Sequence, residues 1–339
     1  MNKLCFLFLT QCIIVGASLG KTQCKLKSSE ETLLVEGTGE ITDDFLSAQY
    51  KPEFYRAHIK HITVANGITG IGANAFSGYT QLTAVDLPES IKTIGNSAFS
   101  HCAQLSHIAL PQHVRSIGFD VFSSCTNLVS ITVPNSVTYV GVGAFSGCSR
   151  LKSIVLPRSI ARIENNLLAG CTQLTSVFIP ANIKTIGEYA FSSCTRLTSI
   201  ALPSGVVSID NFAFSSCTSL LFAKIPPTVQ KIGKYSFFNC SSLASVHYEG
   251  TSEPICDKTS FKAASPKIVV SPKYTSDSFC GISLNKTAHE VIHPASKPSR
   301  NYLDEAFRCI INTVTAVVLV GILFSALIGT TSDNAEMNR

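Results

Sequence analysis

The chain has 339 residues, of which 14% are charged, and its formal net charge at pH 7 is +5. This mild balance excludes the strongly basic patch that nucleic-acid-binding proteins carry, so we expect no nucleic-acid partner. The length allows one or two ordinary domains.

Residues 1–20 have the features of a secretory signal peptide. Lys3 supplies a positive start, an apolar run extends to Gly16, and small residues follow up to Gly20, where we expect cleavage. The apolar run is too short to span a bilayer. Most of the mature chain would then be extracellular, beginning with an N-terminal cap over residues 21–58.

An internal repeat with a period of 23 residues accounts for most of the chain. The recurring residues are Pro88, Pro111, Pro134, Pro157, Pro180, Pro203 and Pro226; Cys102, Cys125, Cys148, Cys171, Cys194, Cys217 and Cys240; and Phe76, Phe99, Phe122, Phe145, Phe191, Phe214 and Phe237. A fixed period of this length is typical of a solenoid. We count about eight units and a closing strand, and assign residues 59–250 to the solenoid.

Residues 82–104 show the plan of one unit. Val85 belongs to a short strand whose alternate side chains point inward, and Pro88 ends this strand because it has no N–H to donate. Ile94 belongs to a second short extended piece, and a single helical turn is then expected to bury Phe99. No unit can bury its apolar side chains alone, so neighbouring units must stack. The sequence predicts a parallel β-sheet, short second strands and single helical turns.

The repeat L-x-x-I-x-L-P-x-x-[VI]-x-x-I-G-x-x-A-F-x-x-C resembles the BspA-type leucine-rich repeat, and the resemblance covers over half of the chain. The segment GTGEITDDF at residues 37–45 also resembles the segment that precedes such arrays. Tyr79 replaces cysteine in the first unit, and Glu164 and Leu168 replace glycine and phenylalanine in the fifth. We therefore expect the fifth unit to be less regular.

The same resemblance implies a role at the cell surface. The family is known from surface proteins of bacteria and parasitic protozoa, and a carboxy-terminal membrane helix with a short tail is similar to the protozoan form. What the resemblance implies is binding, commonly adhesion to host cells or extracellular matrix. The matching positions are structural, so no ligand-reading residue transfers from the family.

Two columns of side chains are expected on the outer face of the predicted sheet, because they alternate with the buried positions. This open sheet face is nearly uncharged, and Val155 and Phe178 lie on successive units. Exposed apolar patches can mark binding surfaces, but β-branched and aromatic residues also suit a sheet without any binding role. The candidate binding residues are His107, Ser130, Thr132, Ser153, Val155, Ser176, Phe178 and Ser199.

A second candidate surface is a mild basic track that recurs near one turn of several units. Such a track can attract acidic glycans, or it can simply keep the turn solvated. Its members are Lys92, Arg115, Arg162, Lys184 and Lys231.

The cysteine column predicts a row of buried free thiols. Thiols stacked in line cannot converge tetrahedrally on zinc, and seven cannot all pair among themselves. Free cysteine behaves as a small core hydrophobe. Cys256 and Cys280 flank the segment that would cap the last unit, so they are candidates for a disulfide. We expect no metal and no cofactor.

Residues 251–305 are assigned to a C-terminal cap and stalk that contains HEVIH, at residues 289–293. H-E-x-x-H is the zinc-protease signature, in which two histidines on one helical face hold the metal. Pro294 disfavours helical geometry at the second histidine, and no third ligand follows at the usual spacing. We favour a chance match and no enzymatic activity. Asn285 in the same segment is a candidate for glycosylation.

Residues 306–329 are predicted to form a membrane-spanning helix, followed by a cytoplasmic tail at residues 330–339. From Cys309 onward the segment carries no charge and would measure ~30 Å as a helix, one hydrocarbon thickness. Its apolarity on all faces argues against a buried core helix. A small-xxx-small stripe would allow a weak homodimer, and it consists of Gly321, Ser325 and Gly329.

These features predict a single-pass type I protein of the plasma membrane with its solenoid outside the cell. The expected function is binding of an extracellular protein or glycan, as an adhesin. The alternatives are a surface receptor and a coat protein without an adhesive role. A zinc protease that uses HEVIH is the least favoured reading.

Overall fold

The computed structural model describes residues 14–15, 25–29, 31–41 and 56–284. The chain divides into two compact units, residues 1–290 and 291–339, and every described residue belongs to the first. Among these residues, no helix has the length and apolarity needed to cross a membrane. Several predicted features lie outside the described residues: the signal peptide apart from residues 14–15, Asn285, HEVIH, the membrane helix with its small-residue stripe, and the tail.

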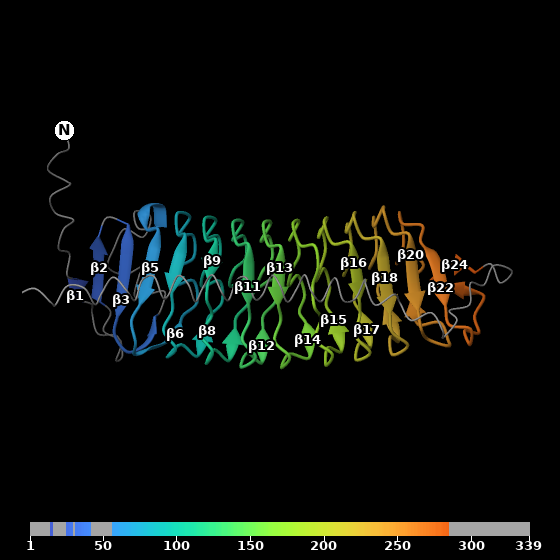
Figure 1. Cartoon of the computed structure of the whole chain (residues 1–339), viewed down its shortest axis with the longest axis horizontal. Helices are drawn as coiled ribbons and strands as arrows, with labels where there is room; N and C mark the ends of the chain where they lie inside the picture. Colours follow the sequence, from blue (N-terminus) through green and yellow to red (C-terminus); the bar gives the residue numbers. More distant parts are fainter. Residues whose placement is uncertain (1–13, 16–24, 30, 42–55, 285–339) are drawn as a thin grey trace, which may run out of the picture. The chain divides into compact units, whose positions relative to one another are not determined.

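The described residues form a solenoid, in which each turn of the chain is a rung stacked on the previous one (Figure 1). The first strands of the rungs form a row of parallel strands that is divided into three sheets, β3 to β9, β11 with β13, and β16 to β22, and β2 and β1 add antiparallel strands at the N-terminal end. These strands are β1 Ile14–Val15, β2 Lys25–Ser29, β3 Thr32–Glu36, β5 His61–Val64, β7 Ala84–Asp86, β9 His107–Ile108, β11 Ser130–Thr132, β13 Ser153–Val155, β16 Ser199–Ala201, β18 Phe222–Ile225, β20 Ser245–Tyr248 and β22 Lys267–Val270.

A second row of short parallel strands runs along another side of the solenoid, as predicted. It consists of β4 Gly39–Ile41, β6 Ile68–Ile71, β8 Thr93–Ile94, β10 Ser116–Ile117, β12 Tyr139–Val140, β14 Arg162–Ile163, β15 Thr185–Ile186, β17 Ser208–Ile209, β19 Lys231–Ile232 and β21 Ile255–Cys256. The register confirms the repeat, since Ser116 lies opposite both Thr93 and Tyr139. The sheets also extend past the predicted limits of the solenoid, because β3 pairs with β5 and β22 pairs with β20.

The segment after each second strand is a series of turns and not the predicted single helical turn. Ser97 and His101 have φ of 54° and 60°, in the left-handed region, which a right-handed helix cannot include. Backbone N–H groups alternate in direction: Ser100 donates within its rung to Ser97, whereas Phe99 donates to Val121 of the next rung. Stacking therefore competes with helix formation, because half of these N–H groups bond between rungs.

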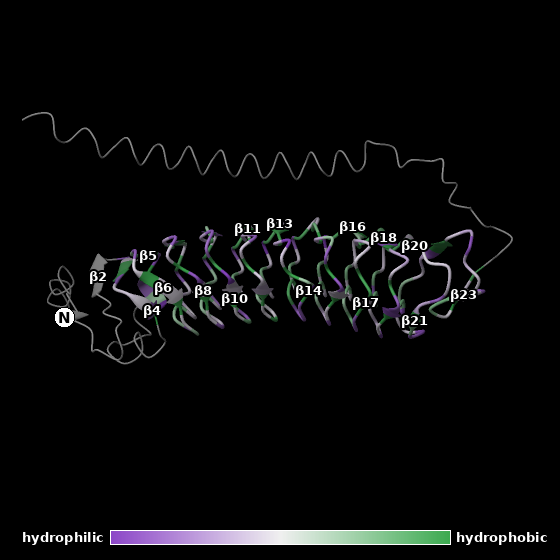
Figure 2. Cartoon of the chain, turned by 90° about the horizontal axis from the view of Figure 1, so that it is seen from below, coloured by the Kyte–Doolittle hydropathy of each residue, from purple (hydrophilic) through white to green (hydrophobic). Residues whose placement is uncertain are grey.

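The core repeats from rung to rung, as the hydropathy colouring in Figure 2 shows. Phenylalanine rings stack in a column: the centroids of Phe99 and Phe122 are 5.6 Å apart and their planes differ by 3°. Leu168 replaces one ring, and the column continues to Phe261, stacked on Phe237 at 5.0 Å.

The predicted free thiols lie beside this phenylalanine column. Each cysteine donates its S–H to a carbonyl oxygen of the preceding rung, as Cys125 does to Phe99 at 3.2 Å. Burial raises the pKa of Cys125 and Cys194 to about 12. The buried free thiols are Cys102, Cys125, Cys148, Cys171, Cys194, Cys217 and Cys240.

The fifth repeat interrupts the second row of strands, in line with its departures from the consensus. Within the described residues, β12 and β14 are not hydrogen-bonded, and the row divides there into two sheets. Glu164 occupies a column of glycines in which rungs approach closely. A Cβ added at Gly141 in this column would lie 2.5 Å from the backbone of Gly118. A larger residue here thus opposes close stacking.

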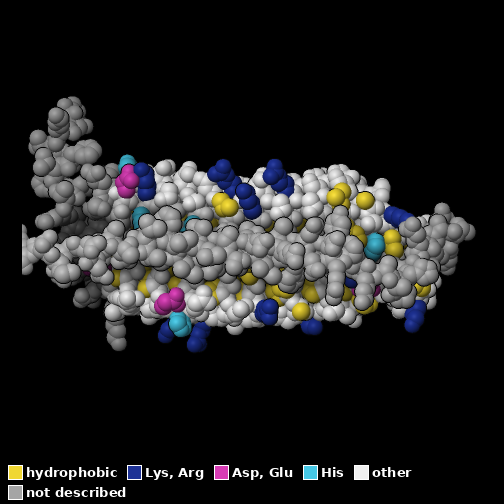
Figure 3. Space-filling model, in the orientation of Figure 1, with side chains coloured by type: hydrophobic (Ala, Val, Ile, Leu, Met, Phe, Trp, Pro, Cys, Tyr) yellow, Lys and Arg dark blue, Asp and Glu magenta, His cyan; other side chains and the backbone are white. Residues whose placement is uncertain are grey.

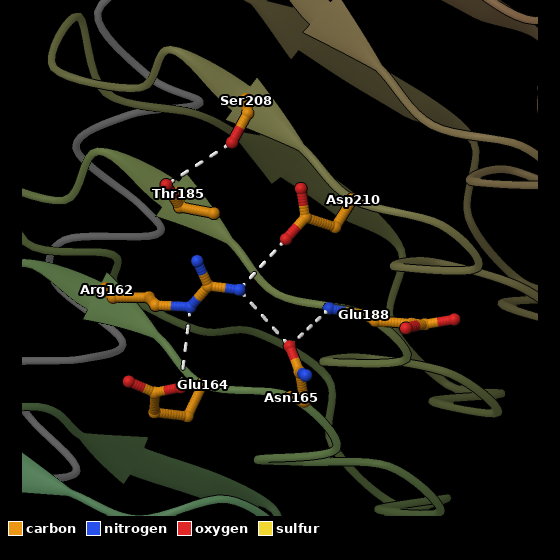
Figure 4. Close-up of polar contacts among 7 residues, drawn as sticks. All are labelled: Arg162, Glu164, Asn165, Thr185, Glu188, Ser208 and Asp210. Carbon is orange, nitrogen blue, oxygen red and sulfur yellow. Dashed lines mark hydrogen bonds and ion pairs between the residues drawn. The ribbon is translucent and has the colours of Figure 1, made fainter.

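An ion-pair network spans the rungs beside this break (Figure 4). The Arg162 guanidinium lies 3.4 Å from the Glu164 carboxylate and donates to Asp210 at 2.9 Å. The same guanidinium donates to Asn165 Oδ1 at 3.3 Å, and this oxygen also accepts the Glu188 N–H at 2.9 Å. Arg162 was predicted to belong to a mild basic track. The structure pairs its guanidinium with Glu164, Asn165 and Asp210, and these acceptors compete with a ligand for its charge.

The C-terminal end of the solenoid is covered by a hairpin of β23, Ser278–Phe279, and β24, Ile282–Ser283. Phe279 is fully buried, and its ring lies 5.1 Å from that of Tyr248. A disulfide joins Cys256 of the last rung to Cys280 of the hairpin. The Glu253 carboxylate accepts the Cys280 N–H at 2.6 Å. The hairpin therefore shields the last rung from solvent.

Candidate binding surface

The open sheet face is formed by the outward side chains of the first strands. Its predicted residues alternate with fully buried isoleucines, such as Ile154 between Ser153 and Val155. His107, Thr132 and Ser199 are exposed, whereas Ser130, Ser153 and Val155 are half-buried. Ser130 lies directly opposite Ser153, and Thr132 opposite Val155. Ser130, Thr132, Ser153 and Val155 therefore share one face, because β11 and β13 pair without a shift.

The row of strands on this face is interrupted between β9 and β11 and again between β13 and β16. Ser176 was expected in a continuous strand, but residues 175–177 form no strand, and Phe178 is joined to Val155 only by an isolated bridge. The Phe178 side chain is 45% exposed, although large aromatic side chains are usually buried. The exposed ring thus lies at a break in the ladder and beside the half-buried Val155.

The C-terminal part of this face carries an aromatic and charged group that the sequence analysis missed. The rings of Phe222 and His247 meet edge to face with centroids 4.8 Å apart. Lys224 and Glu249 form an ion pair at 3.0 Å. Burial, with Lys224 nearby, lowers the pKa of His247. The sequence did contain a signal for them. Phe222 follows Ser199 by 23 residues and His247 follows Lys224 by 23 residues, so both continue the two outward-facing columns of the predicted sheet.

A second exposed apolar group lies on the other side of the rungs and was also missed. Phe119 and Tyr139 are each 48% exposed, and Val142 is 38% exposed. Tyr139 belongs to β12, the strand at the break before the fifth repeat. The equivalent positions in the other repeats are mainly polar, so the apolar residues at these positions could have been noticed in the sequence. This group provides a comparison for the open sheet face.

Potential metal ligands are dispersed over the described part of the chain. Among those residues, no three His, Cys, Asp or Glu side chains lie close enough together to hold a metal ion. Burial raises the pKa of Cys125 and Cys194 to about 12, which disfavours the thiolate that nucleophilic or metal chemistry needs. The open sheet face offers apolar contact at the exposed Phe178 side chain.

A protein-family model matches the repeat region of this chain. A family profile described as "BspA type Leucine rich repeat region" matches residues 50–175 and 141–268. A leucine-rich repeat protein of T. pallidum is 26% identical, covering 54% of this chain and 90% of that one with a TM-score of 0.43. One from Bacteroides ovatus is 23% identical, covering 78% and 80% with a TM-score of 0.45. No curated protein gives a significant match.

Proposed function

We propose that this chain, which belongs to the BspA type leucine-rich repeat family, is a cell-surface adhesin that binds through its open sheet face. The observation that carries the proposal is the exposed Phe178 side chain beside Val155. Burying an aromatic ring of this kind in an interface gives a large apolar contribution to binding. The ligand is an extracellular protein or glycan of host cells or matrix.

Binding would be spread over several rungs. The surface around Phe178 consists of small or polar side chains, among them Thr132, Ser153 and Ala201. Such a surface allows a partner to approach the sheet closely, while the apolar pair excludes water at the centre. Rigid rungs hold these side chains in place, so little conformational entropy is lost on binding. No reaction step is part of this proposal.

The proposal includes the anchoring expected from the sequence. A cleaved signal and a single membrane helix would display the solenoid outside the cell, as a type I protein of the plasma membrane. Weak pairing of the membrane helices would bring two solenoids together and increase avidity for a multivalent surface. Both features concern residues outside the described part of the chain.

Adherence to host cells and immobilised matrix proteins tests the proposal. We expect saturable binding by the chain that survives a metal chelator. Phe178→Asp and Val155→Asp should each reduce it at least about tenfold, with an unchanged circular dichroism spectrum. Tyr139→Asp is the matched control, since Tyr139 is 48% exposed on another side, and it should bind normally. Equal loss in all three variants would rule out the open sheet face, and no binding to any surface would favour a coat protein.

A further inference from the structure

The turns that precede the first strands line one long edge of the solenoid, which we call the hydroxyl–amide edge. It comprises residues 103–106, 126–129, 149–152, 172–175, 195–198 and 218–221. These six segments contain no Asp, no Glu and no aromatic residue. They contain three cations, Arg150, Lys152 and Arg196, all exposed. Figure 3 shows Lys and Arg side chains (dark blue) spread along the long edges of the solenoid. All the charged residues of this edge are therefore positive, and they lie in residues 149–152 and 195–198.

The uncharged side chains of this edge are ordered by bonds between rungs. The hydroxyls form one column: Thr126 donates to the Ala103 carbonyl at 3.2 Å, and Thr172 to that of Ser149 at 3.1 Å. Serine and threonine oxygens keep acceptor lone pairs when they donate in this way. The column thus presents regularly spaced acceptors toward solvent.

A second column on the edge consists of two side-chain amides and a cation, which are joined by hydrogen bonds. Asn127 Nδ2 donates to Gln104 Oε1 at 2.7 Å, and Arg150 Nη1 donates to Asn127 Oδ1 at 3.1 Å. The partner of Arg150 is neutral, so its charge is uncompensated. Among the described residues, Lys152 and Arg196 form no ion pair with a carboxylate either. Within the described ranges, no carboxylate therefore competes with an anion for these three charges.

A shallow hollow of about 580 Å³ lies where these columns meet. Its walls are Val129, Ser149, Arg150, Lys152, Thr172 and Gln173. Arg150 and Arg196 are two rungs apart, which places their backbones ~10 Å from each other, and Gln104 to Arg196 spans ~19 Å at ~4.8 Å per rung. The ligand that fits is therefore an extended chain with recurring anionic groups.

We propose that the hydroxyl–amide edge binds an acidic, sulfated glycan. Its amides and hydroxyls would pair with sugar hydroxyls, and its three cations with sulfate groups. The edge lacks the aromatic side chains on which the bases of single-stranded nucleic acids stack. This site is separate from the open sheet face through which adhesion is proposed, and its ligand class is sulfated glycans.

Binding of the full chain to immobilised heparin tests the proposal. The triple variant Arg150→Gln, Lys152→Gln, Arg196→Gln should bind at least about tenfold more weakly. The matched control Arg158→Gln, Lys184→Gln, Lys231→Gln removes the same charge from exposed residues elsewhere and should bind within about twofold of the parent. Phe178→Asp should bind heparin normally, which separates this site from the open sheet face.

Three results would overturn the proposal: equal loss in the two triple variants, unchanged binding to fully desulfated heparin, or equal binding to a DNA duplex of similar charge. The first would indicate general attraction by net charge, the second a site that does not read sulfate, and the third a site for any polyanion. Heparin binding that is lost only in the Arg150, Lys152 and Arg196 variant supports the assignment.

Discussion

The guanidinium of Arg162 donates a hydrogen bond to the Asp210 carboxylate at 2.9 Å, although the two residues are 48 positions apart in the sequence. They belong to rungs that are separated by a third one, in which Gly187 occupies the column of Glu164 and Asp210. A glycine in the intervening rung leaves room for the guanidinium. Glu164 and Asp210 both occupy positions where most repeats have glycine, and Arg162 pairs with the carboxylates of both residues.

Arg162→Gln and Asp210→Asn form a double-mutant cycle that measures this contact. We expect a coupling energy of about 0.5–1 kcal/mol in the free energy of unfolding, because Arg162 is 40% exposed and solvent screens the pair. Urea unfolding at low salt and in 1 M NaCl gives the value and its screening. The control pair Lys224 and Glu249 is more exposed, 46% and 41%, and should couple more weakly. A larger coupling in the control would contradict our account.

Gly141→Ala should destabilise the solenoid by about 1–3 kcal/mol, since the new Cβ would lie 2.5 Å from the backbone of Gly118 and Phe119. The midpoint of urea unfolding measures the loss. Thr198→Ala, at an exposed position of the hydroxyl–amide edge, is the control and should stay within about 0.5 kcal/mol of the parent. Equal stability of Gly141→Ala would mean that neighbouring rungs separate at little cost.

The seven buried thiols should resist alkylation in the folded chain. All seven side chains are fully buried, so iodoacetamide meets no accessible sulfur, and burial raises the pKa of Cys125 and Cys194 to about 12, which disfavours the reactive thiolate at these two positions. Mass spectrometry after alkylation should find these cysteines unmodified without denaturant and fully modified in guanidinium chloride. Rapid labelling of the folded chain would show that rungs open readily.

The Cys125 thiol makes the free energy of unfolding depend on pH in the alkaline range. The pKa of Cys125 rises to about 12 on folding, so its contribution is complete below the ordinary thiol pKa of about 8.5 and is lost as pH rises toward 12. Urea midpoints between pH 8 and 11 should therefore fall more steeply for the parent than for Cys125→Ala. Parallel curves would remove the thiol from the explanation, because tyrosine and lysine titrate in both proteins.

Removing the disulfide between Cys256 and Cys280 should release the C-terminal hairpin. The bond closes a loop with a sequence separation of 24, for which a loss of about 2–4 kcal/mol is expected. Thermal unfolding of Cys256→Ser, Cys280→Ser measures this, and hydrogen exchange should rise first near Phe279. A non-reduced peptide spanning both cysteines should be lighter by two hydrogens than its reduced form. Free thiols at both positions would contradict the pairing.

Much of this fold was predictable from periodicity alone. The 23-residue step of Pro88, Phe99 and Cys102 determined the stacking, the two rows of strands and the buried column of thiols, because identical units must place equivalent side chains in one line. The alternation around Ile154 likewise determined which residues face outward. The rungs that contain β3 and Phe261 could not be predicted from the period. Thr32 pairs with His61, 29 residues later, and Phe261 stacks on Phe237, 24 residues earlier, so both depart from the 23-residue step.

Only the tertiary structure decided how neighbouring rungs meet. It placed the break in the sheet at Phe178, replaced the expected helical turns by turns with left-handed residues such as Ser97, and joined Arg162 to Asp210. It also showed that the hydroxyls and amides of one edge form ordered columns. The physical reason is common to all four: each depends on contacts between rungs, whereas the sequence pattern describes what one rung buries.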